Sequence, residues 1–229
     1  MQAKRELRRT VIAARDGLSP SDIRRRSEAA GSRLFALPPF QAAGSVMFFV
    51  SFGSEIDTIP MIERALALGK RVAAPRADPV SRALTPCELR SPSEDLVPGA
   101  HGIREPKPHC PPVDPAELDL VVVPGVAWSE DGYRIGYGGG YYDRFLARCV
   151  CAARVGLGFE MQVMPEVPHG QADLPVDILV TDARVRCFLG GDPRLGGDPR
   201  LGGDPRLGGD PRLGGDPRFR AGGAAERKA

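Results

Sequence analysis

Residues 3–15 have the clearest hydrophobic periodicity in the chain. Leu7, Val11, Ala14 and Leu18 recur at the spacing of one helical face, and several basic residues lie between them. This pattern predicts an amphipathic helix whose apolar face packs on the rest of the protein.

Two further helices are predicted from signals at their ends. Ser19 is followed directly by a proline, which is typical of an N-cap and the first helical position, and this helix runs to about Phe35. Another helix begins with Asp57 or Thr58 as its cap. It ends at Gly69, since glycine is the usual residue just past a helix C-terminus.

Unbroken apolar runs predict buried strands, as in the interior of a parallel sheet. The predicted strands are 44–50, 71–74, 120–123, 154–158 and 178–180, with one more helix over 141–149. Strands that alternate with helices predict the α/β class, here a three-layer α/β/α arrangement with a mostly parallel, Rossmann-like sheet. Residues 77–115 are Pro-rich and irregular, with room for short antiparallel strands.

In sheets of this kind, ligands bind beyond the carboxyl ends of the strands. The loops after Val50, Val123 and Val180 are therefore the candidate site.

Composition narrows the class of protein. The 229 residues, 42% of them hydrophobic, suffice for one sizeable core but are few for two full domains. No stretch approaches the ~18–20 apolar residues of a membrane span, so we expect no membrane partner. The Arg-rich start lacks the apolar segment of a secretory signal, and we expect a cytoplasmic protein, with an amphipathic transit peptide as the alternative.

Charge is unevenly distributed. Residues 1–188 carry 23 basic and 23 acidic side chains, yet residues 1–33 hold 9 basic against 4 acidic ones. One basic corner on a neutral body is unlike a nucleic-acid footprint and favours an anionic small molecule.

Five cysteines and three histidines offer few metal-ligand spacings. The odd number of cysteines and the lack of a CxxC pair argue against a disulfide framework and a zinc ribbon. His109-Cys110 and Cys149-x-Cys151 are the only suggestive spacings, and we interpret these cysteines as reduced thiols. We assign no histidine a catalytic role.

The C-terminal segment 189–229 is a repeat. Gly-Gly-Asp-Pro-Arg-Leu begins at residues 190, 196, 202 and 208, and a fifth copy ends in Phe219. One apolar residue in six cannot form a core, and paired glycines with proline oppose helices and strands. We therefore expect a disordered tail, with partner binding as the alternative.

A glycine-rich segment, 136–140, opens directly into the predicted helix that starts at Tyr141. Four glycines in five residues let backbone N–H groups approach a ligand, and the helix N-terminus adds partial positive charge, which suits a phosphate. Arg134 adds a charge-assisted contact, while Tyr137, Tyr141 and Tyr142 offer flat faces for a ring. A flexible turn alone would not need this combination.

Two common phosphate motifs do not fit. A dinucleotide fingerprint needs glycine where Tyr141 stands, and a P-loop needs Ser or Thr where Arg71 follows Gly69-Lys70. The segment therefore predicts a nucleotide or phosphate site without NAD or Walker geometry.

The run from residue 124 to residue 143 closely resembles the signature of the 5-formyltetrahydrofolate cyclo-ligase family, also called methenyltetrahydrofolate synthetases. It contains Asp-Gly-Tyr-Arg-Ile-Gly-Tyr-Gly-Gly-Gly-Tyr-Tyr-Asp from Asp131 onward. Other pieces of the family pattern occur in order: Lys4-Arg5-x-Leu7-Arg8, Glu55-x-Asp57-Thr58, Pro75-Arg76, Gly102-Ile103-Arg104-Glu105-Pro106 and Val176-Asp177. The resemblance covers roughly residues 3–188, and implies a cyclo-ligase domain over 1–188 with the NagB/RpiA/CoA transferase-like fold.

The resemblance also implies an activity. Members of the family convert 5-formyltetrahydrofolate, with ATP as co-substrate and Mg²⁺, into 5,10-methenyltetrahydrofolate, ADP and phosphate. Phosphorylation of the formyl oxygen makes it a leaving group, and N10 then closes the ring, so the protein must position reactants rather than supply a nucleophile.

Site residues follow from the same resemblance. It implies ATP contacts by Lys4, Arg5, Glu6, Leu7, Arg8, Arg134, Ile135, Gly136, Tyr137, Gly138, Gly139, Gly140, Tyr141 and Tyr142. It implies substrate contacts by Arg8, Phe52, Asp57, Tyr137, Gly138, Gly139, Gly140 and Tyr141. Arg134 and Tyr142 are the expected catalytic residues, and Asp143 and Asp177 the expected magnesium ligands, a pair of carboxylates that suits this hard cation.

Some interpretations stay open. Asp57 can instead cap its helix, Asp143 can do the same for the helix that follows the glycines, and Lys4 to Arg8 can be a solvated basic face. Gly139 replaces a lysine of some members. A non-catalytic folate- or nucleotide-binding module is the alternative function, and a sugar-phosphate isomerase or CoA transferase on a related scaffold is a third. We expect a monomer.

Overall fold

The computed structural model describes residues 2–99, 102–171 and 173–188. The repeat segment 189–229 lies outside the described residues, and so does the prediction made for it.

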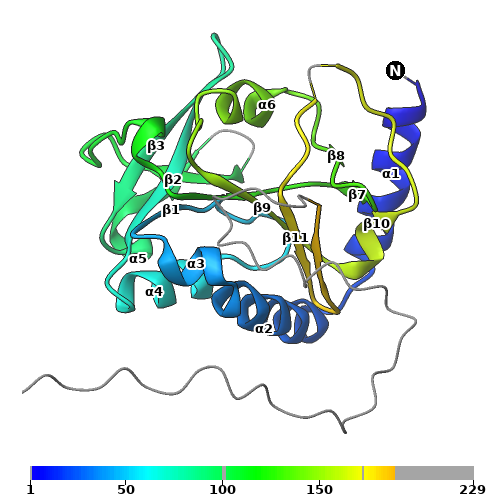
Figure 1. The fold of residues 1–229 in the computed structure, drawn as a ribbon, viewed down its shortest axis with the longest axis horizontal. Coiled ribbons are helices and arrows are strands. Elements are labelled where there is room, and N and C mark those ends of the chain that lie inside the picture. The colour runs from blue at the N-terminus through cyan, green and yellow to red at the C-terminus, as the bar shows by residue number, and fades with distance from the viewer. Residues whose placement is uncertain (1, 100–101, 172, 189–229) are drawn as a thin grey trace, which may run out of the picture.

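A seven-stranded sheet forms the centre of the protein (Figure 1), in the order β12-β11-β9-β6-β1-β2-β3. Its strands are β1 (Ser45–Met47), β2 (Arg71–Asp78), β3 (Ala83–Leu89), β6 (Leu120–Val123), β9 (Ala153–Gly158), β11 (Ile178–Thr181) and β12 (Val185–Cys187). The five inner strands are parallel, and the two edge strands β12 and β3 are antiparallel. The predicted α/β class with a mostly parallel sheet is confirmed.

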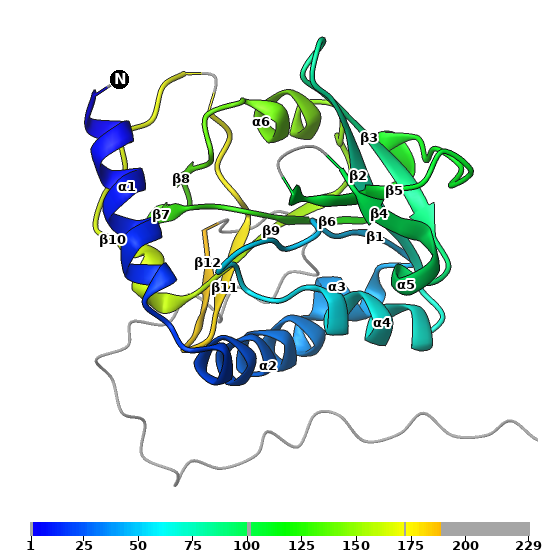
Figure 2. The same cartoon turned by 180° about the vertical axis from the view of Figure 1, so that it is seen from behind.

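Helices pack on both faces of this sheet (Figures 1 and 2). One face carries α2 (Pro20–Ala36), α3 (Pro38–Ala42) and α4 (Ile59–Ala67), and the other carries α6 (Tyr141–Leu146). Strand β6 serves both layers, because alternate side chains of a strand point to opposite faces. Val122 joins the core under α2 and α4, whereas Val121 and Val123 join the core under α6.

Helix α1 (Gln2–Asp16) lies at one end of the molecule, beside a small sheet of β10 (Val163–Met164), β7 (Ala127–Ser129) and β8 (Arg134–Ile135). Leu7 and Val11 of the predicted apolar face pack with Val126 and Ile135, whereas Ala14 is exposed and Leu18 packs against the main core. At the opposite end are α5 (Pro92–Asp95) and the hairpin of β4 (Leu96–Pro98) and β5 (Arg104–Pro106). Two short 3-10 turns, η2 (Pro115–Glu117) and η3 (Glu160–Gln162), complete the described elements.

Several boundaries differ from the predictions. The expected strand 44–50 is a strand only over 45–47, although the buried Phe48 still donates its N–H to the Ala73 carbonyl. The expected helix 141–149 ends at Leu146, because i→i−3 bonds from the N–H groups of Arg148 and Cys149 tighten its last turn. The expected strand 71–74 extends to Asp78.

Residues 77–115 contain the short antiparallel strands for which the sequence left room. Strand β3 pairs antiparallel with β2 over its whole length, and Pro75 faces Pro86 in the register. Proline is tolerated there because β3 is an edge strand and β2 extends beyond its pairing with β1, which reaches only Ala73.

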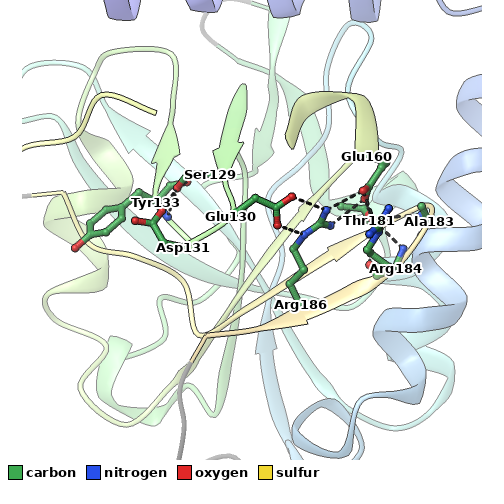
Figure 3. Close-up of polar contacts among 9 residues, drawn as sticks. All are labelled: Ser129, Glu130, Asp131, Tyr133, Glu160, Thr181, Ala183, Arg184 and Arg186. Atoms are coloured by element: carbon green, nitrogen blue, oxygen red, sulfur yellow. Dashed lines mark hydrogen bonds and ion pairs between the residues drawn. The ribbon is translucent and has the colours of Figure 1, made fainter. Parts of the chain in front are cut away.

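Ion pairs fasten β12 to the rest of the protein. Figure 3 shows Arg186 between two carboxylates: its Nε lies 2.8 Å from Glu130 and its Nη2 lies 2.8 Å from Glu160. The hydroxyl of Thr181 also donates to Glu160 at 2.6 Å. The loop after β11 is a local turn into β12, in which the Thr181 N–H donates to the Arg184 carbonyl.

None of the helices in the described residues has the length and apolar character needed to span a membrane.

Candidate active site

The glycine-rich segment connects β8 to α6 and has a backbone that favours glycine. Gly138 and Gly140 have φ of +102° and +67°, in the left-handed region that other residues adopt at a cost. Gly140 is also the N-cap of α6. We call residues 136–140 the glycine loop. The structure therefore contains the predicted glycine-rich segment that leads directly into a helix.

Helix α1 brings two arginines to the glycine loop. Arg8 donates from Nε to the carbonyl of Gly136 at 2.8 Å, and its guanidinium lies beside Gly138. Arg15 donates from Nη2 to the hydroxyl of Tyr137 at 2.8 Å. Two of the basic residues of α1 thus contact the segment predicted to bind phosphate, and Arg15 is only 3% exposed.

The other predicted residues of α1 have different surroundings. Lys4 forms an ion pair with Asp173 at 2.8 Å. Arg5 and Glu6 are exposed, and Leu7 packs in the small core beneath the helix. Within the residues that the structure describes, Arg8 is the one residue of Lys4 to Arg8 that contacts the glycine loop.

The loop that follows β1 closes on the same place. The rings of Phe52 and Tyr137 have centroids 5.1 Å apart and are tilted by 44°. The Tyr137 hydroxyl donates to Glu55 at 2.8 Å, and the Phe52 N–H donates to the other oxygen of this carboxylate. Burial raises the pKa of the Glu55 carboxyl above its ordinary value. Two of the three loops predicted at the strand ends, those after Val50 and Val123, meet here.

Asp57 lies in this loop but makes local contacts. Its Oδ1 accepts from the N–H of Ile59 at 3.1 Å, at the start of α4, and from the Ser51 hydroxyl at 3.4 Å. Thr58 is the N-cap residue of α4. The capping alternative for Asp57 therefore has structural support, while the Phe52 ring lies against Tyr137 of the glycine loop.

Arg134 is held rigidly beneath the start of α6. Its side chain is 4% exposed, and it donates to Asp143 at 2.7 Å and to the Leu174 carbonyl at 2.8 Å. Burial lowers the pKa of this guanidinium from its ordinary value, and the nearby Asp143 carboxylate opposes that shift. Its charge is thus positioned before any ligand binds.

Tyr142 has an unsatisfied hydroxyl. Its Oη is buried and has no hydrogen-bond partner among the residues that the structure describes. Burial raises the pKa of this phenol, so the hydroxyl stays protonated at neutral pH. Arg26 Nε and Trp128 Nε1 are also buried without a partner in the described residues, but of these three groups Tyr142 is the one next to the glycine loop.

The two expected magnesium ligands differ in their surroundings. Asp143 is half-buried, and only its Oδ1 is bonded, to Arg134, in the described part of the chain. Asp177 is 2% exposed, and both of its oxygens are bonded to Arg154, one to the backbone N–H and one to the guanidinium. An oxygen of Asp143 is available to a cation, whereas Asp177 has a structural ion pair.

Three residues outside the predicted set of contact residues complete the site. Glu55 and Arg15 both bond to Tyr137, and Asp173 holds Lys4. Arg15 shares a helical side with Lys4 and Arg8, and this was the signal available for it. The bond from Tyr137 to Glu55 joins residues 82 positions apart, which no local pattern reveals.

The fold and the candidate site together define a small α/β protein in which two arginines of α1 contact a glycine-rich loop. The sequence profile of the 5-formyltetrahydrofolate cyclo-ligase family matches residues 1–182. The chain belongs to this family, a family of ligases, which confirms the family and enzyme class predicted from the sequence.

Relatives and solved structures agree with this assignment. The chain is 34% identical over 174 residues to the 5-formyltetrahydrofolate cyclo-ligase of Escherichia coli strain K12, covering 75% of this chain and 96% of that one. It is 29% identical to the enzyme of that name from Mus musculus, over 76% of this chain and 91% of that one. The NMR structure of Aquifex aeolicus 5,10-methenyltetrahydrofolate synthetase superposes with a TM-score of 0.74 at 36% identity, covering 82% and 94% of the chains.

Proposed function

We propose that the protein converts 5-formyltetrahydrofolate, with ATP and magnesium, into 5,10-methenyltetrahydrofolate, ADP and phosphate. The observation that carries the proposal is the position of Tyr137. Its ring faces Phe52, while Arg8 of α1 contacts the glycines on either side of it. An aromatic pair beside a cationic, side-chain-poor backbone suits a pterin and a polyphosphate bound next to each other.

The formyl oxygen is the chemical obstacle, because an amide oxygen is a very poor leaving group. Transfer of the γ-phosphoryl group from ATP to this oxygen releases ADP and turns the oxygen into part of a phosphate. N10 of the folate then bonds to the formyl carbon, the carbon–oxygen bond breaks, and phosphate and the N10 proton leave. The protein aligns the two substrates, neutralises charge and excludes water.

Arg8 and Arg134 are the proposed cations of this reaction. Arg8 lies at the glycine loop, and Arg134 is fixed by Asp143 and the Leu174 carbonyl, so neither charge needs to be rearranged during phosphoryl transfer. Tyr142 supplies a protonated hydroxyl for an oxygen of the folate or of the phosphate. Its lack of a partner in the described residues supports this role.

Magnesium would be held by Asp143 and by the phosphates of ATP. Mg²⁺ prefers oxygen ligands and is commonly bound through one or two carboxylates together with substrate phosphates. The unbonded oxygen of Asp143 fits this requirement, and the ion-paired Asp177 does not fit it without losing Arg154. When bound, the ion would neutralise charge on the transferring phosphate.

Phe52 and Tyr137 would contact the pterin ring, with an acidic side chain to accept hydrogen bonds from its amino and ring N–H groups. Asp57 is the partner predicted by the resemblance. Glu55 is the better placed acid, because its carboxylate contacts Tyr137 whereas Asp57 contacts the start of α4.

The domain bounds, the fold class, the cellular compartment and the oligomeric state are also part of the proposal. We assign residues 1–188 to one cyclo-ligase domain of the NagB/RpiA/CoA transferase-like class. We further propose that the protein is cytoplasmic and acts as a monomer.

The test is an absorbance assay for the methenyl product, with purified protein, 5-formyltetrahydrofolate, MgCl₂ and with or without ATP. We expect the methenyl product only when ATP is present. In Arg8→Met we expect kcat/KM to fall on the order of a hundredfold. Arg9→Met is the matched control, because Arg9 is exposed on the same helix. Tight nucleotide binding without ADP release would favour the non-catalytic module, and turnover of a phosphosugar without ATP would favour the isomerase.

A further inference from the structure

We propose a second, separate site, in which Asp95, His109 and Cys110 bind a divalent transition-metal ion of the zinc class. One ligand atom from each residue lies within 4.8 Å of the others. The three supply an oxygen, a nitrogen and a sulfur, which is a donor set typical of zinc rather than of magnesium. They share no residue with the candidate active site.

Asp95 is held in place by the backbone around it. Its Oδ2 accepts from the N–H groups of Arg90 at 2.7 Å and Ser91 at 2.9 Å, so its Oδ1 is directed at His109. That Oδ1 lies 3.2 Å from His109 Nε2. Two ligands each about 2 Å from a tetrahedral ion are about 3.3 Å apart, so this pair already has the required separation.

Cys110 is fixed by a backbone turn that closes on the same residue. Lys107 donates its N–H to the Asp95 carbonyl at 2.8 Å, and Cys110 donates its N–H to the Lys107 carbonyl at 3.0 Å. The thiol is buried and lies 3.8 Å from the Asp95 carbonyl oxygen. A small movement of the Cys110 side chain brings its sulfur within bonding distance of an ion held by the other two ligands.

Charge and access are compatible with such an ion. Binding displaces the thiol proton to solvent and replaces the contact between His109 and Asp95, so that a thiolate, a carboxylate and a neutral imidazole surround a divalent cation. Burial and the Asp95 carboxylate raise the pKa of the Cys110 thiol, and Arg76 and Lys107 only oppose that shift, so the ion has to displace a proton that the free thiol holds. The His109 side chain is 64% exposed, which gives the ion a route from solvent and leaves the fourth position to water.

The position of the cluster indicates a structural effect. It joins the end of α5 to the chain beyond β5, at the opposite end of the molecule from α1 (Figure 2). A metal ion there would cross-link two segments that otherwise meet through backbone hydrogen bonds. The ion would therefore stabilise the folded protein by mass action.

Cobalt(II) is the probe, because a thiolate ligand produces a near-ultraviolet charge-transfer band and tetrahedral coordination produces visible bands. The full chain carries Cys151→Ser and Cys187→Ser, since both cysteines are exposed and could bind cobalt elsewhere. We expect the thiolate band in this parent protein and its loss in Cys110→Ser. In His109→Ala we expect affinity for Zn²⁺, measured by competition, to fall by at least about tenfold.

Melting temperature gives a second readout. Zn²⁺ should raise the melting temperature of the parent protein and leave the melting temperature of His109→Ala unchanged. His169→Phe is the control, because it removes a histidine but keeps a ring stacked on Tyr133. His109 is exposed, so its variant decides the question even if Cys110→Ser folds poorly. A parent protein without a thiolate band, or His109→Ala with unchanged Zn²⁺ affinity, would overturn the proposal.

Discussion

The Tyr137 hydroxyl donates a hydrogen bond of 2.8 Å to Glu55, and thereby joins the glycine loop to the loop after β1. Arg15 donates to the same hydroxyl, so one phenol links three segments of the chain. The aromatic face of Tyr137 and the acid proposed to contact the pterin are therefore positioned together.

Tyr137→Phe tests this link. It keeps the ring against Phe52 but removes the bonds to Glu55 and Arg15. A hydrogen bond to a charged group contributes about 1.5–3 kcal/mol, so we expect KM for the folate to rise at least about tenfold. Tyr137→Leu, which also removes the ring, should raise KM further. Equal KM values for wild type and Tyr137→Phe would show that the hydroxyl does not position the site.

Gly138→Ala tests the backbone of the glycine loop. Gly138 has φ of +102°, whereas Gly136 has no atom near the position of an added methyl group. We expect Gly138→Ala to cost about 1–2 kcal/mol of stability or to shift the loop, and to weaken ATP binding. Gly136→Ala should be nearly neutral in stability. Calorimetry with ATP and thermal unfolding measure the two effects, and similar behaviour of the two variants would contradict the expectation.

Asp143→Asn and Asp177→Asn should have different effects. Asp143→Asn is expected to raise the magnesium concentration needed for half-maximal activity, with the fold retained. Asp177→Asn removes the buried partner of Arg154 and should cost about 3–5 kcal/mol of stability. Magnesium titration of activity and denaturant unfolding separate the two. Stable Asp177→Asn protein with weakened magnesium dependence would instead make Asp177 a ligand.

Glu160 predicts a pH dependence of stability. Hydrogen bonds from Arg186 lower the pKa of Glu160 to about 2, with further lowering by the Thr181 hydroxyl. This stabilisation is complete above the ordinary pKa of a glutamate and is lost as pH falls toward about 2. Glu160→Gln should cost about 1 kcal/mol at neutral pH, with allowance for solvent screening, and less in acid. Glu130→Gln is the control, with a side chain that is 56% exposed, and should cost less. Equal losses at pH 3 and pH 7 would contradict this.

Local patterns predicted most of the sheet but not all of its edges. Strand β6 has the predicted bounds, because an apolar run of Val and Leu has few stable alternatives to a buried strand. Residues 77–115 were predicted to be irregular, with room for short antiparallel strands, because the segment is Pro-rich. The structure pairs β3 with β2 along the whole of β3, with Pro75 opposite Pro86. A strand accepts a proline where the edge facing away from its partner has no further hydrogen-bonded strand. Which edges are free in this way is decided only when the whole sheet is assembled.

The sequence by itself determined the family, the class of fold and the glycine loop. These depend on the order of residues and on the conformations that runs of glycine or of apolar residues allow. Tertiary structure alone decided that Glu55 contacts Tyr137, that Asp57 contacts the start of α4, and that Asp177 is bonded to Arg154. An acidic residue has the same appearance in a sequence whether it binds a ligand or an arginine, because its partner is chosen by the packing of segments far apart in the chain.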